Sequence, residues 1–178
     1  ELFRLLAAHR YAEVSAVSST SFEGQTLESV YPALTTKKEH LLGNMDSVIE
    51  ASDVIFAALP HGLSEELAVK TDEKGKVLID LGADFRLTEE ADYTKWYGLP
   101  FKHPALHKKA LYCLPEINRE SIPGVDIIAN PGCYPTSIAL GLMPALKEKL
   151  CDVSNGIILD SKSGVTGAGR GLSQNTHF

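Results

Sequence analysis

The segment DVIFAALPHG, residues 53–62, decides how this chain of 178 residues is expected to fold. Residues 53–59 form an apolar run of the kind found in strands that are buried on both faces. Pro60, His61 and Gly62 then end the run. Residues 64–70 have the composition of a helix, with Ser64 as the expected N-cap. A buried strand followed directly by a helix is the repeating unit of a parallel sheet.

The same pattern recurs along the chain. Residues 76–81 and 126–129 predict two further apolar strands, and residues 13–17 alternate as a strand does before a polar turn. Helices are expected at the N-terminus, around residues 44–50, and over residues 136–150. Residues 84–125, rich in Pro, His and Tyr, show no regular pattern, and we interpret them as an irregular functional excursion. The repeats predict an α/β fold with a mostly parallel sheet.

Composition and charge exclude several classes of protein. The chain is 44% hydrophobic and 22% charged, with a net charge of −6, so it offers no basic surface for a nucleic acid. No apolar run approaches the ~20 residues that span a bilayer. The N-terminal residues ELFRLLAAHR show no cationic leader followed by a cleavage site. We therefore expect a cytoplasmic protein that binds neither nucleic acid nor membrane.

The three cysteines do not form a metal or disulfide pattern, so we predict no metal site. Cys113 and Cys151 lie in unremarkable surroundings, and we interpret both as structural. Cys133 differs, because it stands in IIANPGCYPTS at the junction of a strand and a helix. A helix N-terminus stabilises a thiolate, Pro135 suits the first helical turn, and Gly132 lets a ligand approach the backbone. Cys133 is therefore either a nucleophile or a small buried apolar residue.

Four polar or glycine-containing stretches follow predicted strands. Ligands of parallel sheets bind beyond the carboxyl ends of the strands. One crevice could therefore collect all four stretches, which are Ser18 to Ser21, Pro60 to Gly62, Gly82 to Arg86 and Asn130 to Cys133.

Five motifs together resemble one family over nearly the whole chain. They are ALPHG (58–62), DLGADFRL (80–87), YCLPEINR (112–119), NPGCYPT (130–136) and SGVTGAGR (163–170). In this order they are similar to N-acetyl-gamma-glutamyl-phosphate reductases, NADPH-dependent enzymes of arginine biosynthesis. The resemblance implies a Rossmann-type dinucleotide-binding domain over residues 1–150, ending in the helix after Cys133. Residues 151–178 would begin a glyceraldehyde-3-phosphate-dehydrogenase-like α+β catalytic domain. The residues of this segment themselves predict a strand over 156–160.

The resemblance also indicates which parts of the family lie outside these residues. The glycine-rich first turn and first strand would stand before Glu1, and the catalytic histidine would lie beyond Phe178. His177 does not match that histidine, and we predict no catalytic role for it. Cys113 departs from the family, which usually has glycine in a GLPE-type motif at this place.

The mechanism that the resemblance implies uses Cys133 as the nucleophile. Its thiolate would attack N-acetyl-gamma-glutamyl phosphate and release phosphate, leaving a thioester. Hydride from NADPH would then give a hemithioacetal, which collapses to N-acetyl-glutamate semialdehyde. The family also implies that the full-length protein self-associates as a homo-oligomer.

The candidate ligand contacts follow from the same motifs. Ser18 and Ser19 stand where NAD-binding sheets usually carry an acid, so we predict NADP as the cofactor. We assign cofactor contacts to Pro60, His61, Gly62 and Gly167 as well. The remaining candidates bind substrate, and they are Asn130, Ser163, Gly164 and Arg170.

Alternative interpretations stay open at this point. The protein could be a related semialdehyde-forming reductase, such as aspartate-semialdehyde dehydrogenase or its lysine-pathway counterpart, or a non-catalytic dinucleotide-binding module. Ser18 to Thr20 and the residues around Gly167 could be plain turns, and His61 a turn residue. Asp84 and Arg86 could equally form a local ion pair on a solvated loop.

Overall fold

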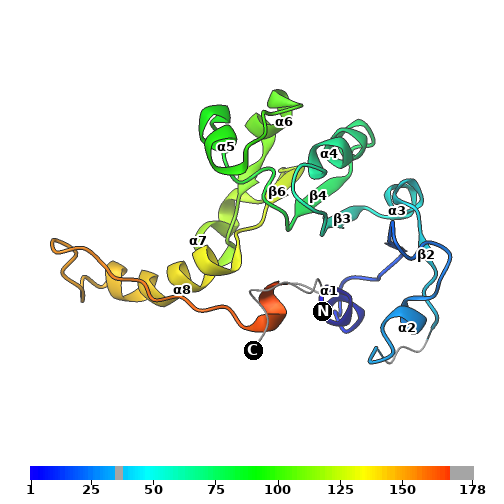
Figure 1. Ribbon diagram of the computed structural model, residues 1–178, viewed down its shortest axis with the longest axis horizontal. Helices are drawn as coiled ribbons and strands as arrows, with labels where there is room; N and C mark the ends of the chain where they lie inside the picture. Colours follow the sequence, from blue (N-terminus) through cyan, green and yellow to red (C-terminus); the bar gives the residue numbers. More distant parts are fainter. Residues whose placement is uncertain (35–37, 169–178) are drawn as a thin grey trace. The chain divides into compact units, whose positions relative to one another are not determined.

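Four parallel strands form the central sheet of the computed structural model, which describes residues 1–34 and 38–168 (Figure 1). Ile55 pairs with Leu78, and Leu78 pairs with Ile127, in the register of the sheet. The strands in sheet order are β3 (Val54–Ala57), β4 (Val77–Asp80), β6 (Ile127–Ala129) and β5 (Leu111–Tyr112). The three apolar strands predicted from the sequence are confirmed, and β5 is an addition that the sequence did not signal.

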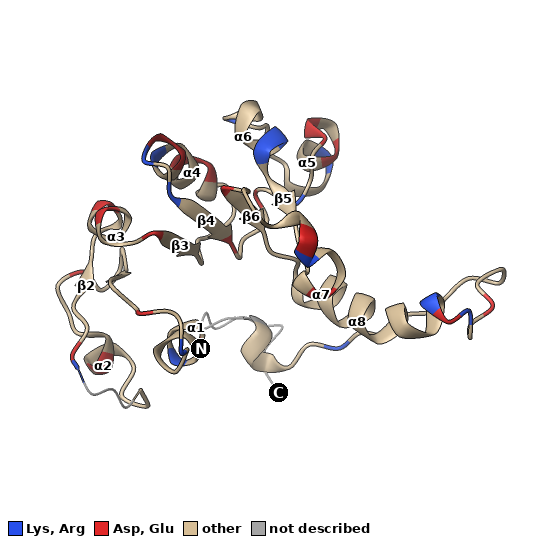
Figure 2. Cartoon of the chain, turned by 180° about the vertical axis from the view of Figure 1, so that it is seen from behind, with Lys and Arg blue, Asp and Glu red and all other residues tan. Residues whose placement is uncertain are grey.

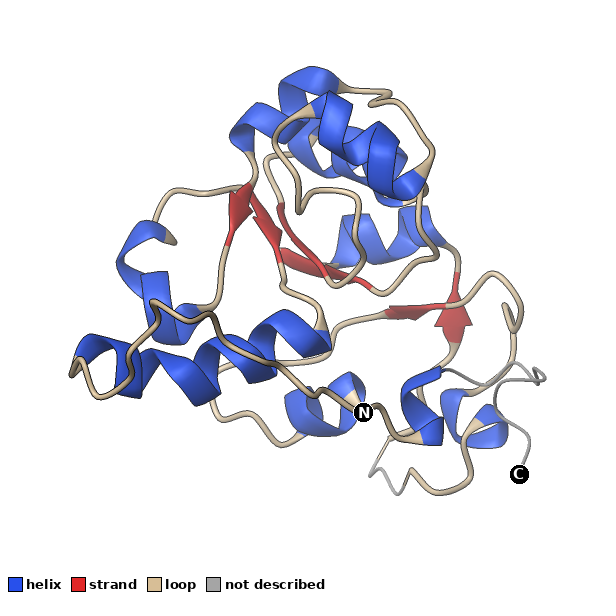
Figure 3. Ribbon diagram, turned by 60° about the vertical axis from the view of Figure 1, so that its left-hand side comes forward, coloured by secondary structure: helices blue, strands red, loops and turns tan. Residues whose placement is uncertain are grey.

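Helices alternate with these strands along the chain, and α4 packs against β4 of the central sheet (Figure 3). Those before β4 are α1 (Leu2–Ala7), α2 (Leu27–Val30), α3 (Met45–Ala51) and α4 (Ser64–Glu73). Those after β4 are α5 (Glu90–Tyr97), α6 (Pro104–Lys109), α7 (Pro115–Asn118) with the 3-10 turn η1 (Arg119–Ser121), and α8 (Cys133–Lys147). Charged residues of both signs lie on α4 and α5 (Figure 2). None of the helices in the described residues is long and apolar enough to cross a membrane.

The core lies between the central sheet and the helices packed on it. Leu78 of β4 and Ala129 of β6 are fully buried, and Leu67 and Ala68 of α4 pack into the same cluster. Burying an aliphatic side chain of this size contributes about 1.5 to 3 kcal/mol relative to leaving it in water. The apolar runs that predict the strands are therefore also the residues that hold them in the sheet.

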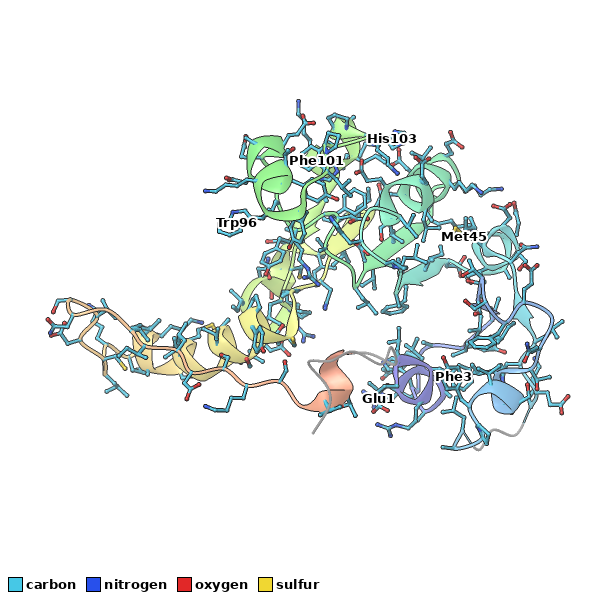
Figure 4. The ribbon with its side chains drawn as sticks, in the orientation of Figure 1. Glu1, Phe3, Met45, Trp96, Phe101 and His103 are labelled. Carbon is cyan, nitrogen blue, oxygen red and sulfur yellow. The ribbon has the colours of Figure 1, made fainter. Side chains whose placement is uncertain are left out.

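A second, shorter sheet contains β1 (Val17–Ser18) and β2 (Leu42–Gly43), which are parallel. Sheets that bind dinucleotides commonly have the strand order 3-2-1-4-5-6. The described strands are compatible with this order, with β2 and β1 as strands three and two, and β3, β4 and β6 as strands four to six. An apolar pocket of about 660 Å³ is lined by residues of β1 and β3. Phe3 of α1 and Met45 of α3, labelled in Figure 4, also line it.

The prediction that residues 84–125 are irregular is wrong. This stretch contains α5, α6, α7, η1 and β5. Buried Glu65 of α4 anchors it, because the carboxylate accepts hydrogen bonds from the backbone N–H groups of Lys102 and His103 at 2.8 and 2.7 Å. Phe101, which stands just before these residues (Figure 4), stacks on His107 with 3.4 Å between ring centroids. Such anchoring joins residues far apart in sequence and leaves no local pattern.

Two further sequence predictions are wrong. Ser64 is the first residue of α4 rather than its N-cap, which is Leu63. The predicted strand over residues 156–160 does not form in the described chain, and Ile158 is 98% exposed there. A strand needs a neighbour to pair its backbone groups, and no such neighbour is present among the described residues.

The chain divides into two compact units, Glu1–Pro131 and Gly132–Phe178. The second unit holds α8 and the 3-10 turn η2 (Val165–Ala168). The helix that contains Cys133 therefore belongs to the second unit, whereas the sequence places it at the end of the first domain. The predicted domain boundary after residue 150 stays a prediction.

Candidate active site

Asp84 is the centre of the polar contacts in the first unit. Its carboxylate is fully buried and lies just after β4. It accepts hydrogen bonds from the backbone N–H of Gly62 at 2.8 and 3.0 Å and from the N–H of Ser64 at 2.8 Å. The hydroxyl of Tyr93 donates to it at 3.2 Å, and burial, followed by the charge of Asp84, raises the pKa of Tyr93. Asp84 thus caps α4 and fixes the loop between β3 and α4.

The backbone conformation of that loop requires glycine at position 62. Its φ of +85° lies in the left-handed region that side chains disfavour. A Cβ at this position would also lie 2.9 Å from Cδ1 of Leu99. The glycine of the ALPHG motif therefore permits the turn that brings the loop onto Asp84.

His61 combines a buried partner with contact to solvent. Its Nδ1 lies 2.6 Å from Oδ1 of Asp84, and its side chain is 29% exposed. The imidazole also packs against Tyr93 and Tyr97, with ring centroids 5.4 and 4.6 Å apart. These contacts hold the ring in place at the end of β3, while part of the side chain stays exposed to solvent.

Arg86 joins the ends of two neighbouring strands. Its Nε donates to the carbonyl oxygen of Asn130 at 2.9 Å, and its Nη2 donates to the carbonyl oxygen of Leu81 at 3.0 Å. The backbone N–H of Asn130 in turn donates to the carbonyl oxygen of Asp80 at 2.8 Å. The interpretation of Asp84 and Arg86 as an ion pair on a solvated loop is wrong, because Asp84 is buried against His61 and Arg86 binds backbone carbonyls.

Asp80 is a buried acid that sequence reasoning missed. Its Oδ1 accepts hydrogen bonds from Ser64 Oγ at 2.8 Å and from the N–H of Gly82 at 3.0 Å. Its Oδ2 has no hydrogen-bond partner among the described residues. Burial raises the pKa of Asp80 above the ordinary value of 3.8. The available signal was a single acid ending an otherwise apolar strand.

Ser18, the last residue of β1, and Ser19, which follows it, differ in their contacts. Ser18 is exposed and lines the apolar pocket. Ser19 is bound on both sides: its N–H donates to the carbonyl of Gly43 in β2 at 3.2 Å, and its Oγ accepts from the N–H of Phe22 in its own turn at 3.3 Å. Of the two, Ser18 has the more accessible side chain.

Cys133 is exposed and is the first residue of the 15-residue helix α8, whose N-cap is Gly132. The backbone N–H groups in the first turn of a helix favour negative charge, which suits a thiolate. Cys151 is exposed as well, whereas Cys113 is buried and burial raises its pKa. The interpretation of Cys133 as a buried apolar residue is therefore wrong.

The glycine-rich loop is linked to the start of α8. Ser163 Oγ donates to the hydroxyl of Tyr134 at 2.9 Å, within the second unit. The N–H of Gly167 donates to the carbonyl of Gly164 at 2.9 Å. This N–H group is therefore already used within the loop. Arg170 and His177 lie outside the described residues.

Within each unit, the structure gives the candidate residues the following places. Pro60, His61 and Gly62 lie together with Asp84 at the carboxyl ends of β3 and β4, and Asn130 follows β6. Ser18 and Ser19 stand at the end of β1. The second unit contains Cys133, Ser163, Gly164 and Gly167.

Comparison with known families agrees with this parallel sheet and with the location of these motifs. A family model described as the NAD binding domain of semialdehyde dehydrogenase matches residues 1–125. The chain belongs to the semialdehyde dehydrogenase family. A second model of this family, described as the dimerisation domain of semialdehyde dehydrogenase, matches residues 133–178. The predicted α/β, dinucleotide-binding fold is confirmed.

Individual members of the family give a more detailed comparison. The chain is 56% identical over 178 residues to an N-acetyl-gamma-glutamyl-phosphate reductase of Clostridium botulinum (strain Alaska E43 / Type E3). It is 48% identical over 178 residues to the protein of this name from Clostridium kluyveri (strain NBRC 12016). It is 44% identical over 187 residues to that of Pelotomaculum thermopropionicum. The alignments cover 100% of this chain and 52% of each relative, so the chain spans about half their length. The resemblance predicted from the motifs is confirmed.

Proposed function

We propose that the intact protein reduces N-acetyl-gamma-glutamyl phosphate to N-acetyl-glutamate semialdehyde and releases phosphate, as a step of arginine biosynthesis. The observation that carries this proposal is Cys133, an exposed thiol on the first residue of α8, in a chain similar throughout to reductases of that name. A thiol on the first turn of a long helix is suited to attack an acyl phosphate, because the helix favours the thiolate.

The proposed chemistry takes place at the Cys133 sulfur. Sγ forms a bond to the acyl carbon while the bond from that carbon to the phosphate oxygen breaks, which leaves a thioester and inorganic phosphate. NADPH, when bound, supplies the hydride that reduces this thioester. The resulting hemithioacetal then loses the Cys133 thiolate and its hydroxyl proton, giving the free aldehyde. Sulfur is suited to both steps, since it is a strong nucleophile and a good leaving group.

The cofactor in this proposal is NADP. The exposed loop residues Pro60 and His61 follow β3, at the edge of the sheet where dinucleotides bind. Gly62, with its left-handed φ, permits the turn of this loop. Ser18 ends β1 without an acid, so a ribose 2′-phosphate would meet no like charge there. These residues fit the group, and we assign Ser19 and Gly167 to the same cofactor.

Replacing Ser18 tests the cofactor assignment. Ser18→Asp places a carboxylate beside the 2′-phosphate and should weaken NADPH binding to the intact protein by about 1 kcal/mol or more. Ser18→Asn is the matched control of similar size without charge, and fluorescence titration measures both. Equal NADPH affinities for the two variants would show that Ser18 does not face the ribose.

Substrate contacts are proposed at Asn130, Ser163, Gly164 and Arg170. Asn130 stands three residues before Cys133, and Ser163 is hydrogen-bonded to Tyr134, the residue after it. The activity is tested on the intact protein by following NADPH oxidation with N-acetyl-gamma-glutamyl phosphate and, separately, with aspartyl phosphate. Turnover of the first alone supports the proposal. Turnover of aspartyl phosphate alone would assign a related semialdehyde dehydrogenase, and turnover of neither would favour a non-catalytic module.

The remaining parts of the proposal concern assembly and location. The match of residues 133–178 to a dimerisation domain supports a homo-oligomer. We further propose that the protein acts in the cytoplasm on small molecules and binds no nucleic acid. Residues 1–150 would provide the cofactor-binding domain, and residues 151–178 would begin the catalytic domain.

A further inference from the structure

The buried carboxylate of Asp84 has one partner that also reaches solvent. Three of its donors, the N–H groups of Gly62 and Ser64 and the hydroxyl of Tyr93, only hold local structure together. The fourth neighbour, Nδ1 of His61, belongs to a side chain that is 29% exposed. Capping a helix does not by itself require the contact between Asp84 and His61.

The distance between Asp84 and His61 determines where the imidazole proton resides. Oδ1 and Nδ1 are 2.6 Å apart, and two lone pairs at that separation would repel each other. Asp84 accepts hydrogen bonds from all its other neighbours and so acts as an acceptor here as well. The proton must therefore be on Nδ1. When one ring nitrogen of histidine is held in this way, the other is the one offered to a ligand.

We propose that Asp84 is a positioning residue for the reduction: it keeps a proton on Nδ1 of His61 and thereby presents Nε2 to the bound dinucleotide. This inference rests on the proposed function, since it takes the loop after β3 as part of the cofactor site. The packing of the imidazole against Tyr93 and Tyr97 adds to it, because the ring is already fixed before a ligand arrives. A fixed contact atom loses little conformational entropy on binding.

The first measurement determines the protonation of His61 directly. The intact protein is labelled with 15N-histidine, and the side-chain nitrogen shifts are recorded without cofactor. The His61 signals are assigned by their loss in His61→Gln. We expect Nδ1 to carry a proton in the wild type and to lose this fixed state in Asp84→Asn. A wild-type His61 that carries its proton on Nε2 alone would overturn the proposal.

The second measurement is the NADPH dissociation constant of matched variants. Asp84→Asn should weaken binding about tenfold, which is the worth of one hydrogen bond, and raise the KM for NADPH more than that for the acyl phosphate. Tyr93→Phe is the control, because it removes another donor to the same carboxylate and leaves the contact with His61. Equal affinities for Asp84→Asn and Tyr93→Phe would contradict the positioning role.

Two conservative changes at His61 keep the proposal testable if Asp84→Asn does not fold. His61→Gln places an amide near the position of Nε2, whereas His61→Asn places one near Nδ1. We expect His61→Gln to bind NADPH about tenfold more tightly than His61→Asn. Equal affinities would overturn the proposal. Failure of the wild type to bind NADPH at all would instead refute the proposed function, and with it the role of Nε2.

Discussion

At the scale of single residues, the surroundings of the cysteines separate a reactive position from an inert one. Cys133 is exposed at the first position of α8, where helix N–H groups stabilise a thiolate. Cys113 is buried, and burial raises its pKa, which keeps it a neutral thiol. Cys151 is exposed but follows the end of α8 instead of beginning a helix. Helix position and burial thus determine the expected order of reactivity of the three thiols.

Replacing Cys133 tests the residue that carries the proposed reaction. Cys133→Ser in the intact protein should lower kcat by at least about a thousandfold, because a hydroxyl is a far weaker nucleophile than a thiolate. NADPH binding and the unfolding transition should change little, because the side chain is exposed. Cys151→Ser is the control for loss of an exposed thiol. A Cys133→Ser enzyme that retains a substantial fraction of its activity would remove Cys133 from the nucleophile role.

At the scale of elements, the loop after β4 connects three strand ends through two side chains. Asp84 binds the loop that follows β3, and Arg86 binds the carbonyls of Leu81 after β4 and Asn130 after β6. The GADFRL motif therefore has a structural role. It links the ends of the strands at which the candidate ligand contacts stand.

The stability of this connection can be measured by removing the Arg86 guanidinium. Arg86→Met keeps most of the apolar stem but leaves two carbonyl oxygens without their donors. We expect the free energy of unfolding of the intact protein to fall by about 1 to 3 kcal/mol in urea. Lys108→Met, on an exposed position of α6, is the control and should have a smaller effect. An equal, small change in both variants would show that Arg86 does not hold the strand ends together.

Asp80 predicts a pH dependence of stability whose sign can be worked out. Burial raises the pKa of Asp80 in the folded protein above 3.8, so the folded state holds this proton more tightly than the unfolded state. The stability that this protonation provides is present at acidic pH and is lost as pH rises through the folded pKa. Asp80→Asn, which cannot ionise, should therefore become progressively more stable relative to wild type as pH rises.

Urea unfolding of wild type and Asp80→Asn, measured from below pH 3.8 upward through the folded pKa of Asp80, tests the direction of this pH dependence. Asp92→Asn, at an exposed position of α5, is the matched control. A difference between Asp80→Asn and wild type that stays constant with pH would show that burial of Asp80 does not perturb its ionisation.

At the scale of the whole molecule, the second unit has apolar side chains that the described residues leave uncovered. Leu150, Val153, Ile158 and Leu159 are 77%, 53%, 98% and 50% exposed. They lie within the residues that match a dimerisation domain. Exposed apolar groups in such number are typical of surfaces that pair with another surface.

Ile158 is the position at which self-association is best tested. Ile158→Glu would place a charge within this exposed apolar stretch and should weaken association of the intact protein by at least about tenfold. Lys162→Glu is the control, because it changes charge at another exposed position of the same unit. Sedimentation velocity over a range of concentrations measures both. Unchanged association of Ile158→Glu would place Ile158 outside the interface.

Local patterns predicted one part of this fold and missed another. The strands β3, β4 and β6 were predictable, because a short apolar run that ends at Gly or Pro is typical of a buried strand. The strand β5 was not, since its two residues become a strand only by pairing with β6. The predicted strand over residues 156–160 failed for the same physical reason, because backbone pairing depends on a neighbour and not on the segment itself.

The sequence by itself determined the α/β class, the strand ends at which the candidate ligand contacts stand, and the position of Cys133 at the start of a helix. These features follow from residues adjacent in the chain, where spacing and turn chemistry act directly. Only the tertiary structure decided that Asp84 lies against His61, that Arg86 binds Asn130, and that buried Asp80 has one oxygen without a hydrogen-bond partner in the described part of the chain. The contact of Asp84 with His61 joins residues 23 positions apart, and that of Arg86 with Asn130 joins residues 44 positions apart. Both arise from packing of the sheet and helices, which no local pattern encodes.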